Sequence, residues 1–197
     1  MRRLSLQKII RCSWAGEDPD YCNYHDYEWG VPVHDDKKLF EMLILEGFQA
    51  GLSWITILKK RENFRKAFAN WDWKKVAKFS DKEINDLMEN PGIIRNRLKI
   101  SSAIKNAVCF IEVRKEFGSF DTYIWKFTDY KTIYPDSPPE KISDLPVKSE
   151  ISDIMSKDLK KRGFNFVGSV ICYSFMQAVG MVNDHMRHCF KFIKNTH

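Results

Sequence analysis

The sequence DKKLFEMLILEGFQAGLSW, residues 36 to 54, decides how this chain folds. Its apolar residues recur at the three- and four-residue spacing of a helix that buries one face: Leu39, Phe40, Leu43 and Ile44. We expect this helix to run from Asp36 to about Phe48, with Gly47 and Gly51 loosening the chain around its end. The stretch therefore predicts a core helix followed by a turn.

Similar patterns predict further helices on both sides of a proline-rich segment. Ser80 and Glu83 spell an S-x-x-E capping box, and Gly118 is typical of a helix end. We expect helices from Ser53 to about Phe68, from Ser80 to Asn90, from about Ile100 to Gly118, from Ser149 to Arg162 and from about Val170 to Val179. Residues 128 to 148 carry four prolines and are expected to form a surface excursion that does not touch a functional site. No alternating run predicts a strand, so the fold class is all-α.

Length and charge narrow the class of protein. At 197 residues with no linker-like break, the chain fits one domain. No apolar run approaches the roughly 20 residues of a membrane span, and the first ten residues lack the apolar stretch of a secretory signal. We expect a soluble protein with no membrane partner. The net charge of +6 fits a polyanion such as nucleic acid without requiring one.

Cysteine and histidine residues near the two ends of the chain suggest a metal site. His185 and Cys189 are four residues apart, which on a helix would place both on one face. Cys12 and His25 are the best complementary pair near the other end, and four such ligands would close a tetrahedral zinc site. Spacing alone leaves open an ordinary buried role, or rival ligand sets that use Cys22, Cys172 or His188.

A carboxylate and several aromatic residues suggest a binding pocket. Glu46 interrupts an apolar stretch, although a single glutamate more often faces solvent. Aromatic residues cluster near the N-terminus, and many of them could simply be core: Trp14, Tyr21, Tyr24, Tyr27 and Trp29, with Trp54 further along. Aromatic faces with one carboxylate suit a flat, cationic heterocycle that carries amino groups.

Two long motifs resemble one known family. The segments EGFQAGLSWITILKKREN, residues 46 to 63, and LKKRGFNFVGSVICYSFMQAVGMVNDH, residues 159 to 185, are similar to the 3-methyladenine DNA glycosylase I family. The similarity spans nearly everything from Arg11 to about Cys189. Residues 1–10 are read as an extension before a single domain at 11–197.

The resemblance implies a fold, an activity and a set of site residues. The fold would be that of helix-hairpin-helix DNA glycosylases, with one structural zinc held by Cys12, His25, His185 and Cys189. The activity would be hydrolysis of the N-glycosidic bond of N3-methyladenine in double-stranded DNA, by a monomeric bacterial protein in the cytoplasm. Glu46 would read the base and act in catalysis, while Tyr21, Tyr24, Trp29 and Trp54 would bind it.

The resemblance also implies how DNA is held. Gly51 and Leu52 would present a wedge that fills the gap left by a flipped base. Backbone N–H groups of Gly92 and Ile93, in the segment NPGIIRNRLKI at residues 90 to 100, would hold a phosphate. Related glycosylases use an aspartate after the hairpin, but here no aspartate lies between Gly92 and Asp121. The stretch does contain Glu112, which we leave out of the catalytic set. No lysine stands out as a nucleophile, so strand cleavage is not expected.

Two other functions compete with this interpretation. A non-catalytic module that recognises altered DNA would keep the charge and the aromatic residues but leave Glu46 without a purpose. A metal-dependent nuclease would need an open coordination position, which a Cys2His2 set does not provide.

Overall fold

Helix α2 (Asp36–Gln49) forms the centre of the computed structural model, which describes residues 9–192. Ten consecutive residues of α2, from Leu39 to Phe48, are buried, because neighbouring helices cover it on all sides. The side chain of Asp35 accepts the backbone N–H of Lys38 and so caps its first turn. The sequence predicted one apolar face, whereas the helix is buried all round.

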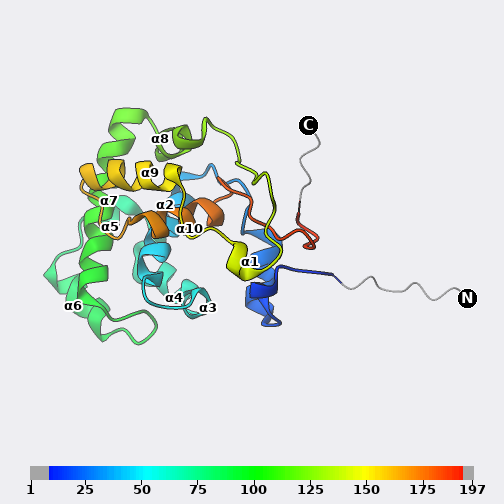
Figure 1. Cartoon of the computed structure of the whole chain (residues 1–197). Helices are drawn as coiled ribbons and strands as arrows, with labels where there is room; N and C mark the ends of the chain where they lie inside the picture. The colour runs from blue at the N-terminus through cyan, green and yellow to red at the C-terminus, as the bar shows by residue number, and fades with distance from the viewer. Residues whose placement is uncertain (1–8, 193–197) are drawn as a thin grey trace, which may run out of the picture.

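The other helices wrap this core (Figure 1). They are α1 (Pro19–Tyr27), α3 (Trp54–Leu58), α4 (Arg61–Ala67), α5 (Trp73–Val76), α6 (Asp81–Glu89), α7 (Arg97–Phe117), α8 (Phe120–Trp125), α9 (Glu150–Lys161) and α10 (Ser169–Ala178), with short 3-10 turns between some of them. Within residues 9–192 the β pairing consists of one isolated bridge, between Ile133 and Val182. The all-α expectation is therefore confirmed for this part of the chain. No helix in residues 9–192 is both long and apolar enough to cross a membrane.

Local signals placed several helix ends correctly. The capping box of Ser80 and Glu83 is present at the start of α6, and Gly118 follows the last residue of α7. The single helix expected from Ser53 to Phe68 is wrong, because α3 and α4 are separated at Lys59 and Lys60. That break brings Arg61 to the inside, where it pairs with acidic residues of neighbouring elements.

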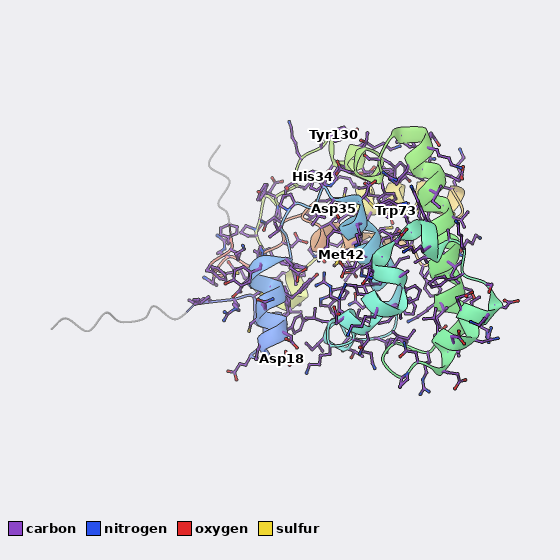
Figure 2. All side chains as sticks on the ribbon, turned by 180° about the vertical axis from the view of Figure 1, so that it is seen from behind. Asp18, His34, Asp35, Met42, Trp73 and Tyr130 are labelled. Carbon is purple, nitrogen blue, oxygen red and sulfur yellow. The ribbon has the colours of Figure 1, made fainter. Side chains whose placement is uncertain are left out.

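The first and the last described segments of the chain lie side by side. Figure 1 shows the last described segment, in red, against the blue N-terminal segment that leads into α1. The backbone N–H of Phe190 donates to the carbonyl of Ile10 over 2.8 Å. Asp18 caps the first turn of α1. Figure 2 shows that it lies far from His34 and Asp35, the residues that lead into α2. Of the extension expected at residues 1–10, residues 1–8 lie outside the described part.

A helical hairpin, α6 and α7, supports the far end of α2. The buried Lys99 of α7 donates from Nζ to the carbonyl oxygens of Phe48 and Ala50, over 2.8 and 2.6 Å. A cation at a helix C-terminus is favourable because the last carbonyls have no partner within the helix. Gly51 follows with a φ of +78°, a conformation that glycine adopts without strain. Lys99 thus fixes the turn that carries Leu52.

Candidate active site and metal centre

Four residues from the two ends of the chain form one buried cluster: Cys12, His25, His185 and Cys189. One ligand atom from each lies within 4.8 Å of the other three. Cys189 Sγ is 3.3 Å from His25 Nε2 and 3.6 Å from His185 Nδ1, and Cys12 Sγ is 3.5 Å from His185 Nδ1. Tetrahedral bonds of zinc to nitrogen and sulfur imply ligand separations of roughly 3.3–3.8 Å. The cluster therefore fits a tetrahedral metal ion.

Neighbouring groups orient each ligand toward the centre of the cluster. His25 pairs through Nδ1 with Asp26 over 2.8 Å, and His185 donates from Nε2 to the carbonyl of Trp29 over 3.2 Å. The other nitrogen of each ring, His25 Nε2 and His185 Nδ1, therefore lies toward the cysteine sulfurs of the cluster, as in known histidine sites. The backbone N–H of Met186 donates to Cys12 Sγ. Hydrogen bonds, first from the Cys12 thiol and then from both histidines, lower the pKa of Cys189.

His185 and Cys189 converge without lying on a helix, so the expectation from helical spacing is wrong. His185 and Cys189 lie in an irregular segment with a turn at 187–190, after α10 has ended at Ala178. The pair does converge, but a turn closed by the hydrogen bond from Cys189 N to the Met186 carbonyl brings it together. The rival cysteines lie elsewhere, with Cys22 Sγ donating to the Gly16 carbonyl and Cys172 Sγ to the Val167 carbonyl.

Aromatic rings connect the metal cluster to a cavity. The Trp29 ring meets His185 edge-on at 4.7 Å between centroids, and Trp14 meets His25 at 5.2 Å. Trp14 also packs on Tyr21 and on Trp29, at 5.1 and 4.9 Å. The cluster therefore positions rings that line the cavity.

The cavity has a volume of about 290 Å³. Its wall brings together Glu46 and the four aromatic residues predicted to bind a base, Tyr21, Tyr24, Trp29 and Trp54. The other residues of the wall are Trp14, Gln49, Ile142, Leu145, Pro146, Val147, Ser174 and Gln177. Tyr27, in contrast, is 72% exposed and lies outside.

Part of this wall was not predicted. Residues 142–147 belong to the proline-rich segment, which was expected to stay away from the site, and that expectation is wrong. The yellow-green chain runs from α8 toward α1 in Figure 1. The bridge between Ile133 and Val182 ties its beginning to the segment after α10. The path of the proline-rich segment depends on contacts between residues distant in sequence, and so does the position of Gln177 in the wall. Neither could be read from local sequence patterns.

Glu46 is a desolvated carboxyl group in this cavity. The residue is 3% exposed, and no group of residues 9–192 donates a hydrogen bond to its Oε2. Burial raises the pKa of Glu46 to about 8. A buried carboxylate without a partner is costly, and a ligand that brings positive charge or N–H donors would remove that cost.

Tyr24 and Trp54 form an aromatic pair beside Glu46. Their ring centroids are 5.2 Å apart, and burial raises the pKa of Tyr24, so its hydroxyl stays neutral. Behind them, the Arg61 guanidinium donates to Glu28 over 2.9 Å and to Glu41 over 2.6 Å. These ion pairs hold the end of α1 against α2 and α4.

Of the predicted DNA contacts, Leu52 is exposed, whereas the backbone N–H groups of Gly92 and Ile93 already have an acceptor within the protein. Leu52 is 40% exposed at the turn after α2, and a second small cavity that includes Leu52 shares Glu46 with the main one. In the turn between α6 and α7, the N–H of Gly92 donates to Asn90 Oδ1 over 2.8 Å, and that of Ile93 to the Asn90 carbonyl over 3.4 Å. A phosphate at this turn would compete with Asn90.

Comparisons with known proteins agree with this geometry. Residues 14–192 match the methyladenine glycosylase family. The chain is 48% identical to the DNA-3-methyladenine glycosylase of Haemophilus influenzae over 179 residues, 91% of this chain and 96% of that protein. It is 49% identical to DNA-3-methyladenine glycosylase 1 of Escherichia coli, again over 91% of this chain, and 95% of that protein.

Solved structures give the same result. A crystal structure of a 3-methyladenine DNA glycosylase I superposes with a TM-score of 0.90 at 47% identity, covering 93% of this chain and all of that one (100%). A variant of such an enzyme in complex with 3-methyladenine superposes with a TM-score of 0.88 at 36% identity, covering 93% of this chain and 98% of that one. The chain belongs to the methyladenine glycosylase family.

Proposed function

We propose that the protein is a DNA glycosylase that removes N3-methyladenine from alkylated double-stranded DNA and leaves an abasic site. The observation that carries this proposal is the buried Glu46, whose Oε2 has no partner in a cavity walled by aromatic rings. The relatives named above are glycosylases for this base.

Recognition would use the charge of the damaged base. N3-methyladenine in DNA is cationic, so the rings of Tyr24 and Trp54 would attract it through their π faces. Tyr21 and Trp29 would complete the aromatic wall. Glu46 would accept the N–H groups of the base, and the positive charge would favour its ionised form. An undamaged adenine is neutral and would not offset the cost of the buried carboxylate.

The damaged nucleotide must leave the duplex to reach this cavity, at a cost of a few kcal/mol. Leu52, exposed on the Gly51 turn, would fill the gap in the stack. The α6–α7 hairpin would serve as a helix-hairpin-helix element, with Gly92 and Ile93 near a phosphate once Asn90 releases the backbone N–H. Lys99 joins the hairpin to the turn that carries the wedge.

Hydrolysis would depend mainly on the leaving group. The positive charge of N3-methyladenine already weakens the glycosidic bond, so Glu46 would stabilise the departing base rather than protonate it. Glu112 is exposed and pairs with Lys115 over 2.7 Å, which supports leaving it out of the catalytic set. Among residues 9–192, no lysine lines the cavity, and we therefore propose a monofunctional enzyme without lyase activity.

Zinc would have a structural role. Cys12, His25, His185 and Cys189 would fill all four positions of a tetrahedral ion, leaving none for a reacting water. Through Trp29 and Trp14, the clasp would hold the N-terminal aromatic residues over the pocket.

The test is to incubate the protein with methylated DNA and to identify the released bases by chromatography. We expect free 3-methyladenine and intact strands at abasic sites. Glu46→Gln should reduce excision strongly while binding to undamaged DNA stays nearly unchanged. Glu112→Gln, the matched control, should excise as wild type does. Absence of released 3-methyladenine from a folded, zinc-loaded sample would refute the proposal.

A further inference from the structure

Gln177 of α10 lies in the cavity wall and is held from behind by a buried carboxylate. Its amide nitrogen Nε2 donates to Asp184 Oδ2 over 2.8 Å. Asp184 is 1% exposed, and its Oδ2 also accepts the hydroxyl of Tyr173 over 2.7 Å. The same glutamine is half-buried and lines the cavity that contains Glu46.

This arrangement fixes which end of the amide serves the cavity. A glutamine side chain has a donating NH₂ end and an accepting carbonyl end, and its partners decide how it is turned. The carboxylate of Asp184 can only accept hydrogen bonds, so the NH₂ end faces Asp184. The carbonyl oxygen Oε1 is left to serve the cavity, where it can only accept a hydrogen bond.

We propose that Gln177 is a specificity-determining residue that makes the pocket select 6-amino purines over 6-oxo purines. This inference rests on the proposed function. An amino group can donate to the Gln177 carbonyl, whereas an oxo group would face it with its own lone pairs. Burying acceptors against an acceptor is strongly unfavourable, and specificity arises from such repulsion as much as from attraction. Asp184 acts through Gln177 and is a positioning residue.

The proposal is tested by the affinities of free bases, measured by tryptophan fluorescence. The probes are 3-methyladenine and its 6-oxo counterpart, 3-methylhypoxanthine, and zinc content is verified for each variant. Gln177→Met removes the acceptor and should lower the preference for 3-methyladenine about 10- to 100-fold, as expected when a site loses a discriminating hydrogen bond. Asp184→Asn can turn the Gln177 amide over and should lower the same ratio.

Two further variants separate positioning from general damage. Asp184→Asn should add little to the ratio in a Gln177→Met background, because its effect passes through Gln177. Cys172→Ser changes a buried residue of the same helix outside the cavity and should keep the wild-type ratio. If the wild type binds and excises 3-methyladenine but Gln177→Met keeps its preference, the inference is overturned while the proposed function stands. A wild type that neither binds nor excises the base would overturn the proposed function itself.

Discussion

Replacing Glu46 by glutamine should stabilise the ligand-free protein, by an amount that grows with pH. Burial raises the pKa of Glu46 from 4.5 to about 8. Between these values the carboxyl is neutral in the folded protein and ionised in the unfolded chain. The contribution of the Glu46 carboxyl to the free energy of unfolding is therefore fully present below about pH 4.5. It is lost progressively as the pH rises toward 8.

The size of the effect follows from the width of that window. Each pH unit costs about 1.4 kcal/mol, so wild type loses about 3 kcal/mol by pH 7 and about 5 kcal/mol above pH 8. A glutamine side chain does not ionise, so it makes no such pH-dependent contribution. Glu46→Gln should match wild type near pH 4.5 and exceed it by about 3 kcal/mol at pH 7, which for a chain of this length raises the Tm by about 6–12 °C.

Urea unfolding of both proteins at several pH values measures this difference. Glu112→Gln serves as the control, because that carboxylate is exposed and its replacement should change stability by less than about 0.5 kcal/mol at every pH. A Glu46→Gln protein that is no more stable than wild type at pH 8, or whose advantage does not vary with pH, would show that Glu46 is not desolvated. The proposal that the cavity binds a cationic base through Glu46 would then be disproved.

Three further predictions concern the surroundings of the pocket. Cys189→Ser should lose the single bound zinc, seen by elemental analysis, and should lower the Tm; full metal content would show the ligand assignment wrong. Lys99→Met leaves two carbonyls at the C-terminal end of α2, those of Phe48 and Ala50, without their partner and should cost about 1–3 kcal/mol of stability. The Lys99→Met variant should lose more excision activity on DNA than affinity for the free base. Equal losses would disprove that Lys99 acts by holding the turn that carries Leu52. Leu145→Ala should weaken 3-methyladenine binding about three- to tenfold in a titration, since each buried methylene contributes about 0.8 kcal/mol; unchanged affinity would remove the proline-rich segment from the site.

Local signals predicted much of the fold. The capping box at Ser80, the glycine after α7 and the apolar periodicity of α2 involve residues close in sequence, so their effect is visible without the structure. The break between α3 and α4 was missed because Arg61, which follows it, pairs with Glu28 and Glu41, and these come from distant segments.

The candidate site was predicted for different reasons. The Cys/His set came from the family resemblance, and the helical spacing offered for His185 and Cys189 was wrong even though the pair converges. Glu46 could be singled out because a charged residue interrupts an apolar run. Gln177 carries no such signal, because its role depends on Asp184 behind it and on a cavity built from several segments.

We propose that a metal clasp between the N-terminal and C-terminal segments holds the aromatic pocket around Glu46. The most direct measurement is calorimetric titration of 3-methyladenine into zinc-loaded and chelator-stripped protein, with helix content followed by circular dichroism. We expect the loaded protein to bind the base and the stripped protein to lose at least about tenfold in affinity while keeping most of its helices, since second-shell contacts link ligands to the pocket. Equal affinity in both samples, with zinc removal verified, would show that the metal does not hold the pocket.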